Sequence, residues 1–191
     1  RTGGLAAYTA LSFGATVARG NEWVSATRSA LDPTGEASAR LLVEWLFQQG
    51  TILPGDPLIL SSVSGTNTLV VELALKAREM GATVIAVTGA DFSRELASAH
   101  SSKKRLFEVA DVVLDNCAPY GDAALTIEGF DSPVAAWSGL AGAALMWAVT
   151  AGIVEKCTAA GIVPTVYSSY NLPGGGDRYA ASRLAYRASG Q

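Results

Sequence analysis

A short run of hydroxyl and amide side chains around one glycine carries the most readable chemistry in this sequence. The run comes directly after an uncharged apolar stretch and directly before a helical pattern, and it comprises Ser62, Ser64, Gly65, Thr66 and Asn67. Glycine permits a tight turn, and the helix that follows presents its unpaired N–H groups and the positive end of its dipole. The segment therefore predicts a phosphate site that needs no lysine. A capped strand-to-helix turn is the alternative interpretation, because Ser and Thr are ordinary N-caps.

Three other side chains could move protons. His100 is the only histidine, the residue type that most easily gains and loses a proton near neutral pH, although it could equally be an exposed loop residue. Glu72 follows the glycine by less than two helical turns, where it is a base or a solvated helix-face carboxylate. Asp122 follows Gly121 in a loop and is a base, a ligand contact or a turn cap.

The phosphate run requires a strand before it and a helix after it. The pattern predicts a strand at Leu58–Ser61 and a helix at Thr66–Met80, which Gly81 closes. A second strand follows at Thr83–Val87, and a helix at Glu36–Gln48 precedes the first. The run is thus expected at the carboxyl end of a buried strand.

Further strand and helix patterns extend this alternation. A short helix is predicted at Arg105–Ala110 and a third strand at Asp111–Leu114. Apolar strands alternating with helices indicate an α/β fold with a mainly parallel sheet, whose ligands bind beyond the carboxyl ends of the strands. Polar residues at the later strand ends are therefore expected to contact a ligand; they are Thr88, Asp115 and Asn116.

The C-terminal part begins with a long helix predicted at Pro133–Thr158, with Asp131 or Ser132 as its cap. The stretch from Ser132 to Val154 has no charged residue and is long enough to span a bilayer. It is rich in Ala and Gly, so it predicts a buried or subunit-interface helix and no membrane span.

Weaker patterns occur at both ends of the chain. A strand or extended segment is predicted at Val163–Ser168, and Pro173 with Gly174–Gly176 predicts a flexible break. A final amphipathic helix follows at Asp177–Arg187, and a weak strand pattern lies at Leu5–Ala10.

Composition limits the function classes. The chain has 191 residues, 49% of them hydrophobic, with a net charge of −3 and a pI near 5.1. This predicts one domain in a cytoplasmic metabolic protein and argues against binding to nucleic acid or to an anionic membrane. Cys117 and Cys157 lack zinc-site spacing and are expected as reduced thiols. No metal or other cofactor is predicted, although spacing alone leaves open a metal shared between subunits.

Two longer segments resemble a known family. SSVSGTNTLVVELALKAREMGATVIAVTG resembles the phosphosugar-binding region of SIS (sugar isomerase) domains, except that Asn67 replaces the usual final Thr or Ser. HSSKKRLFEVADVVLDNCAPYGDAAL, from His100 to Leu125, is similar to a subgroup of uncharacterised bacterial SIS proteins related to phosphoheptose isomerases. The resemblance implies a single SIS domain over residues 1–191, a three-layer αβα sandwich with a flavodoxin-like sheet. Its phosphosugar-binding core would lie at about 54–125, and its long interface helix at about 133–158.

The resemblance also bears on the start of the chain. In that subgroup the stretch matched by Arg1-Thr2-Gly3-Gly4-Leu5 follows an earlier helix and a central strand of the sheet. The native protein is therefore expected to have a further segment before Arg1. A complete open reading frame that begins at Arg1 would contradict this expectation.

The resemblance implies an aldose–ketose phosphosugar isomerase that transfers a proton on the open-chain sugar. His100, Glu72 and Asp122 are then the candidate catalytic groups, and the polar strand-end residues are candidates for contacts with sugar hydroxyls. A sugar-phosphate sensing module without chemistry and a lyase for sugar ethers are the alternatives on the same fold. A homodimer or homotetramer is expected, because active sites in the family are usually completed by a neighbouring subunit.

Overall fold

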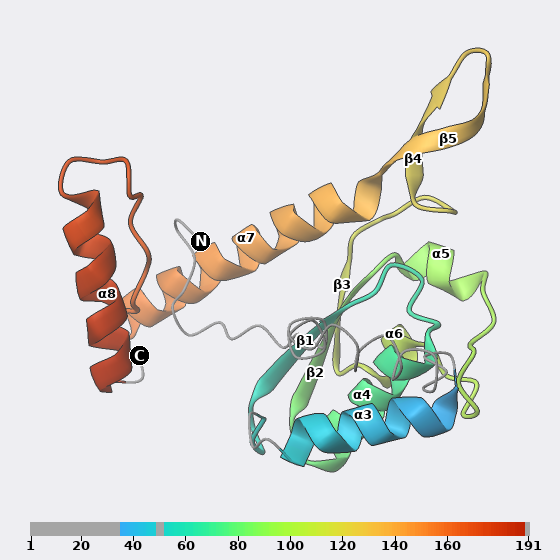
Figure 1. Ribbon diagram of the computed structural model, residues 1–191, viewed down its shortest axis with the longest axis horizontal. Helices are drawn as coiled ribbons and strands as arrows, with labels where there is room; N and C mark the ends of the chain where they lie inside the picture. Colours follow the sequence, from blue (N-terminus) through green and yellow to red (C-terminus); the bar gives the residue numbers. More distant parts are fainter. Residues whose placement is uncertain (1–34, 49–51, 190–191) are drawn as a thin grey trace, which may run out of the picture. The chain divides into compact units, whose positions relative to one another are not determined.

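The structure is a computed structural model that describes residues 35–48 and 52–189 (Figure 1). Its described residues up to Ala143 form one compact unit, and those from Ala144 onward belong to a second. The strand predicted at Leu5–Ala10 and the stretch from Arg1 to Leu5 lie outside the described residues.

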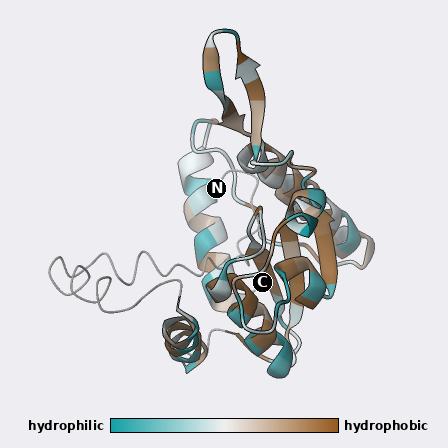
Figure 2. Cartoon of the chain, turned by 90° about the vertical axis from the view of Figure 1, so that its right-hand side faces the viewer, coloured by the Kyte–Doolittle hydropathy of each residue, from teal (hydrophilic) through white to brown (hydrophobic). Residues whose placement is uncertain are grey.

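A parallel sheet forms the centre of the first unit. Its strands are β1 (Pro57–Ser61), β2 (Thr83–Thr88) and β3 (Val112–Asp115), in the order β1-β2-β3. These strands are predominantly hydrophobic (brown in Figure 2), as expected where a sheet is covered by helices. All three predicted strands are confirmed within one or two residues, and the α/β class with them. The described part of the sheet has three parallel strands.

Four helices of the described residues accompany this sheet. The helix predicted at Glu36–Gln48 is confirmed as α3, and α4 (Thr68–Glu79) packs against it and against β1 and β2. The short helix α5 (Ala90–Arg94) was not predicted, and α6 (Leu106–Val109) lies inside the predicted range. The core between helices and sheet contains fully buried side chains, among them Val43, Val71, Val84 and Leu106.

Helix α4 begins two residues later than predicted because of Asn67. This residue is the N-cap, and its side-chain oxygen accepts the N–H of Leu69 at 2.9 Å. At the other end the predicted role of Gly81 is confirmed, since it follows the C-cap residue with a φ of +82°.

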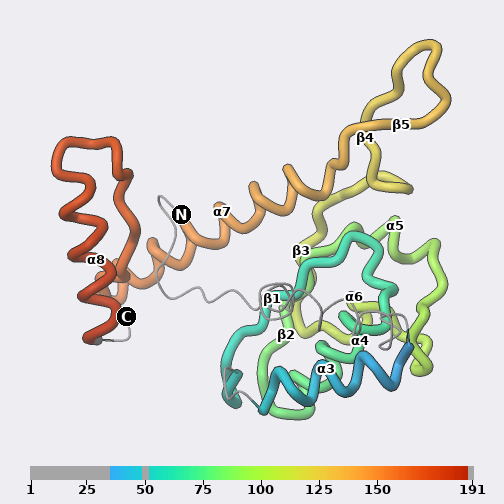
Figure 3. The backbone as a smooth tube through the Cα atoms, viewed as in Figure 1, coloured from blue at the N-terminus to red at the C-terminus, as the bar shows by residue number. Residues whose placement is uncertain are grey.

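Figure 3 shows the path that positions the site. The chain runs from β1 through α4 to β2, and from β2 through α5 and α6 to β3. Because the three strands are parallel, the loops after β1, β2 and β3 leave from the same edge of the sheet.

The segment after β3 corrects the sequence prediction. An antiparallel hairpin, β4 (Ala123–Ile127) and β5 (Phe130–Ala136), occupies the region where Pro133 was expected to begin a helix. Between the pairs Leu125–Val134 and Ile127–Phe130 the register shifts, so β5 carries extra residues there. A proline is tolerated at such a bulge because the ladder is already interrupted.

Helix α7 (Trp137–Ala159) therefore starts four residues later than the predicted Pro133, and neither Asp131 nor Ser132 is its cap. Among the described residues it is the one helix long and apolar enough to cross a membrane, which is weak evidence because core helices meet the same test. Only Thr150 of this helix is buried within the described chain. Among the described residues, the expected role of α7 as a buried helix is thus not fulfilled.

The second unit ends in α8 (Gly175–Ser189), which confirms and lengthens the helix predicted at Asp177–Arg187. Residues 163–168 form no strand apart from an isolated bridge at Val166, in agreement with the extended alternative. The helix starts inside the glycine run, where a Cβ on Gly175 would lie 2.1 Å from the carbonyl oxygen of Ser169. This run is thus a close-packed helix start and not the flexible break that was predicted.

Candidate functional site

The predicted phosphate loop, residues 62–67, forms a tight turn between β1 and α4. Gly65 has a φ of +60°, and its N–H donates to Ser62 Oγ at 3.2 Å. Thr66 Oγ1 donates to Ser64 Oγ at 3.2 Å. The three hydroxyl residues are half-buried and stand before the first turn of a helix of 12 residues. The structure therefore brings the predicted donors together at a helix N-terminus, where an anion is stabilised.

The segment between α5 and α6 holds this loop by main-chain hydrogen bonds. Leu106 donates its N–H to the carbonyl oxygen of Gly65 at 2.8 Å, and Ala99 donates its N–H to that of Thr66 at 3.0 Å. A Cβ on Gly65 would lie 3.1 Å from Leu106 Cβ, so the loop packs closely against α6. These contacts fix the phosphate loop before any ligand arrives.

One end of the Asn67 side chain is used in a hydrogen bond within the fold. Its side-chain oxygen caps α4, and its NH₂ group is the part of the side chain left as a donor. The atypical Asn at this position of the loop is therefore an N-cap, as well as a predicted phosphate ligand.

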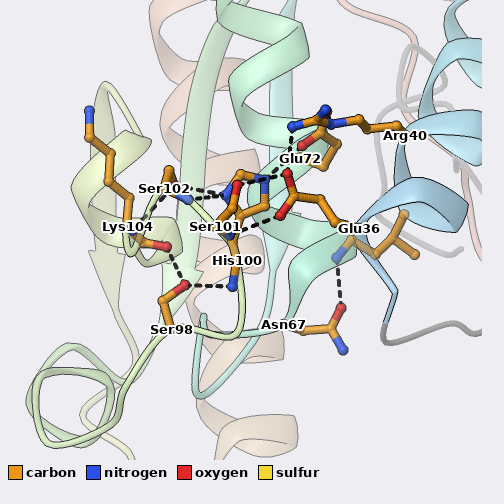
Figure 4. Close-up of polar contacts among 10 residues, drawn as sticks. Glu36, Arg40, Asn67, Glu72, Ser98, His100, Ser101, Ser102 and Lys104 are labelled. Atoms are coloured by element: carbon orange, nitrogen blue, oxygen red, sulfur yellow. Dashed lines mark hydrogen bonds and ion pairs between the residues drawn. The ribbon is translucent and has the colours of Figure 1, made fainter.

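Two of the three predicted catalytic residues lie together. His100 Nε2 is 2.7 Å from Glu72 Oε2, although 28 positions separate these residues in the sequence (Figure 4). The His100 ring is almost fully buried, whereas the Glu72 side chain is 16% exposed. Ala99, the residue before His100, donates its backbone N–H to the carbonyl oxygen of Thr66. This hydrogen bond connects the pair to the phosphate loop.

Two residues of α3 complete the cluster and were missed by the sequence analysis. Glu36 accepts the N–H of Ser101 at 3.0 Å and its hydroxyl at 2.7 Å, and these bonds lower the pKa of Glu36. Arg40 contacts Glu36 at 2.5 Å and Glu72 at 3.4 Å. The signals available were the Glu36–Arg40 spacing on one helix face and the serine that follows His100, but neither indicates which elements meet.

The polar atoms of Glu36, Glu72 and His100 lie within 4.8 Å of one another, so these residues could hold a metal ion. Their wide spacing in the sequence explains why no metal cluster was predicted. In this arrangement the guanidinium of Arg40 contacts both carboxylates and supplies the positive charge that a metal would otherwise bring. The geometry is that of an ion-pair network.

The polar residues at the ends of β2 and β3 hold the fold together. Thr88 is fully buried and donates its hydroxyl hydrogen to the carbonyl oxygen of Val63 at 3.1 Å. Asp115 Oδ1 accepts the N–H of Ala90 at 3.0 Å, and the buried Asn116 accepts that of Ala118 at 3.0 Å. These contacts favour turn capping over the predicted contacts with a sugar.

Asp122, the third predicted catalytic residue, is bound at the start of α7. Its two carboxylate oxygens accept the N–H of Ser138 at 2.7 Å and its hydroxyl at 2.6 Å, while its carbonyl oxygen accepts the N–H of Trp137. No hydrogen bond or ion pair connects Asp122 with Glu72 or His100 in the described part of the chain. Its geometry is that of a helix cap.

The guanidinium of Arg105 is also used in contacts within the fold. Its guanidinium donates to the carbonyl oxygens of Ser93 at 3.3 Å and Arg94 at 2.8 Å, at the end of α5. It also pairs with Glu108, which raises the pKa of Arg105 and lowers that of Glu108 to about 2. These hydrogen bonds and the ion pair stabilise the segment that contains Leu106.

Comparison with known families matches part of this chain to one of them. Residues 1–89 match the profile of the SIS domain. The matched range includes α3, β1, the phosphate loop, α4 and β2, and it extends over residues that the structure does not describe.

Relatives at the sequence level carry the name UPF0309 protein. One from Shouchella clausii is 37% identical over 130 residues, which are 68% of this chain and 53% of the relative. Another from Listeria monocytogenes is 41% identical over 122 residues, or 64% of this chain and 52% of the relative. A third, from Brucella anthropi, is 40% identical over 132 residues, or 69% and 53%. The matched part of the chain spans about half the length of these relatives, whose names state no reaction.

Proposed function

Because this chain belongs to the SIS domain family, we propose that it binds a sugar phosphate and interconverts the aldose and ketose forms of that sugar. Membership of the family implies phosphosugar binding. The reaction is our proposal, as is every property of the whole protein, since a fold alone does not define a function.

The observation that carries the proposal is the attachment of a proton-transfer pair to the phosphate loop. Glu72 lies on α4, little more than one turn after the helix starts at Thr68, and the loop of His100 is bonded to Thr66 through Ala99. Phosphate held at the start of α4 would therefore present the rest of a substrate near a carboxylate. An anion site and a base in one place are what an isomerase requires.

The chemistry follows from these two parts. A base removes the proton from the carbon beside the carbonyl of the open-chain sugar, which gives an enediolate. The base exchanges its proton with water and then returns a proton to the neighbouring carbon. The phosphate is not altered and serves as a handle whose binding energy orients the reacting carbons. The Glu72–His100 pair supplies the group that carries the proton.

Binding is tested by thermal shift against sugar phosphates of different chain length. The wild type should be stabilised by at least one of them, and Ser64→Ala should lose that stabilisation because it removes a loop hydroxyl. Ser132→Ala, which changes an exposed serine of β5, is the matched control and should respond like the wild type. If no sugar phosphate stabilises the wild type, or if Ser64→Ala responds equally, the phosphate site is wrong.

Catalysis is tested separately by NMR in D₂O with the sugar phosphate that stabilises most. An isomerase would form the other sugar isomer and exchange the hydrogen of the carbon beside the carbonyl with deuterium. Binding without conversion or exchange would refute the isomerase and leave the sensing module and the lyase for sugar ethers.

We also propose that the protein is a cytoplasmic homodimer or homotetramer that associates through α7. Large side chains of this helix are exposed in the single chain, with Leu140 at 69% and Trp147 at 51%. Apolar surface of this size is usually covered by a partner. The mass in solution at micromolar concentration tests the proposal, and a monomer would contradict it. Recovery of the protein in the membrane fraction would instead indicate that α7 lies in a bilayer.

A further inference from the structure

We propose that the two residues of the pair have different roles. Glu72 is the base that accepts the substrate proton. His100, held as its Nε2–H tautomer, is the positioning residue for Glu72. This inference rests on the proposed function, because it assigns roles within the same site. The sequence alone left both residues as candidates for the base.

Exposure separates the two side chains. The side chain of His100 is 3% exposed, and its Nε2 edge is covered by Glu72 Oε2 at 2.7 Å. The Glu72 side chain retains 16% exposure, and its other oxygen, Oε1, has Arg40 Nε as its neighbour at 3.4 Å. A substrate carbon can therefore approach the carboxylate of Glu72, whereas the histidine ring lies behind it.

The tautomer of His100 follows from its other nitrogen. The backbone N–H of Ser102 donates to Nδ1 at 3.1 Å, and the hydroxyl oxygen of Ser102 lies 2.8 Å from the same atom. A backbone N–H can only donate, so Nδ1 must be an acceptor. The proton of the neutral ring is then on Nε2, where it points at Glu72 Oε2. The ring cannot accept a substrate proton at Nδ1 without breaking the bond from Ser102.

The surrounding residues keep this arrangement in place. Glu36 holds Ser101, the residue between His100 and Ser102, by two hydrogen bonds. Ser98 Oγ accepts the backbone N–H of His100 at 3.1 Å and donates to the carbonyl oxygen of Lys104 at 2.6 Å. The loop of His100 is thus closed on itself and anchored to α3, which gives the ring a fixed position relative to Glu72.

The proton transfer balances with these roles. The C–H bond of the substrate breaks, its proton binds Oε1 of Glu72, and the electron pair remains on the sugar as an enediolate. The hydroxyl proton of the enediolate passes to the former carbonyl oxygen and neutralises its charge, and a proton then leaves Oε1 for the neighbouring carbon. The second oxygen becomes the new carbonyl, and the carboxylate of Glu72 is restored. His100 keeps its own proton throughout and donates it to Oε2 as a hydrogen bond. The positive charge of Arg40 lies beside Oε1 and pairs with the carboxylate that is present before and after the transfer.

The tautomer can be measured directly because the chain contains a single histidine. ¹⁵N NMR of the histidine-labelled full chain at neutral pH should show Nε2 bearing hydrogen and Nδ1 without it. In Glu72→Gln the tautomer should persist, since Ser102 still donates to Nδ1. A ring protonated on Nδ1, alone or together with Nε2, would overturn the assignment.

Three variants measure the roles by isomerisation rate. Glu72→Gln should lower the rate roughly a hundred- to ten-thousand-fold, the contribution typical of a general base. His100→Gln should stay within about tenfold of the wild type, because its amide can still donate to Glu72. His100→Ala should lose more than His100→Gln, because no donor from position 100 then holds Oε2 of Glu72 in place.

Circular dichroism identifies any variant that does not fold, and His100→Gln keeps the test informative if His100→Ala is one of them. A Glu72→Gln variant with wild-type rate, or a His100→Gln variant as inactive as Glu72→Gln, would overturn the inference while sugar-phosphate binding remained intact. Absence of stabilisation by any sugar phosphate would instead refute the proposed function, and the role of Glu72 with it.

Discussion

Gly65→Ala tests whether the phosphate loop depends on glycine for its backbone and for its packing. At a φ of +60° an L-residue is strained by about 1–2 kcal/mol relative to glycine. The new Cβ would also lie 3.1 Å from Leu106 Cβ and 3.3 Å from the hydroxyl oxygens of Ser93 and Thr88. All three neighbours are fully buried, so they cannot move aside freely.

The magnitude follows from these two effects. Overpacking of a rigid core adds about 1–3 kcal/mol to the strain, so a total loss of about 2–5 kcal/mol is expected. Gly55→Ala is the matched control, because Gly55 has a φ of +89° in the same compact unit and no atom within 4 Å of a Cβ placed there. It should lose about 1–2 kcal/mol from backbone strain alone.

Urea unfolding followed by circular dichroism measures both variants. With a slope of about 2 kcal/mol per molar urea, Gly65→Ala should unfold about 1–2.5 M earlier than the wild type, and Gly55→Ala about 0.5–1 M earlier. Gly65→Ala should also lose stabilisation by sugar phosphates, while Gly55→Ala keeps it. Equal midpoints for the two variants would show that packing against Leu106 does not constrain the loop.

Three further changes test the structural roles of Asp122, Thr88 and Glu108. Asp122→Ala should lose about 0.5–2 kcal/mol in urea unfolding, as for other helix caps, without changing stabilisation by sugar phosphates. Thr88→Val should lose about 0.5–1.5 kcal/mol in the same assay, because one hydrogen bond to Val63 is removed. Glu108→Gln should be less stable than the wild type at pH 7 and equal to it near pH 2. The pKa of Glu108 is about 2 in the folded protein and about 4.3 in the unfolded chain. The ionised carboxylate therefore stabilises the fold fully above the unfolded pKa, and this stabilisation is lost as the pH falls through the folded pKa. Urea midpoints at pH 7, 4 and 2 measure this difference.

The parts of the fold that the sequence predicts well are those determined by local patterns. Apolar runs mark β1 and β2, and the glycine between hydroxyl residues marks the phosphate loop. The boundary of α4 shifted by two residues because the cap was Asn67, a residue that the pattern assigned to the phosphate. Local composition predicts where elements are and leaves their ends less certain.

Features that depend on distant contacts were not predictable in the same way. The bond between Glu36 and Ser101 joins residues 65 positions apart, so no spacing rule identifies it. The hairpin of β4 and β5 was missed because Pro133 and the small residues after it resemble the start of a helix, whereas the pairing that places Pro133 in a strand depends on β4. Short elements such as α5 have too few residues for a periodic pattern.

The main-chain bonds from Ala99 and Leu106 to the phosphate loop have an evolutionary consequence. A peptide N–H is present whatever the side chain, so most amino acids at position 99 keep the hydrogen bond that anchors the loop. Proline is the exception, because it lacks the donor. Divergent members of the family can therefore preserve this site with little sequence identity after α5, and a missing motif in that region is a poor reason to conclude that the site has been lost.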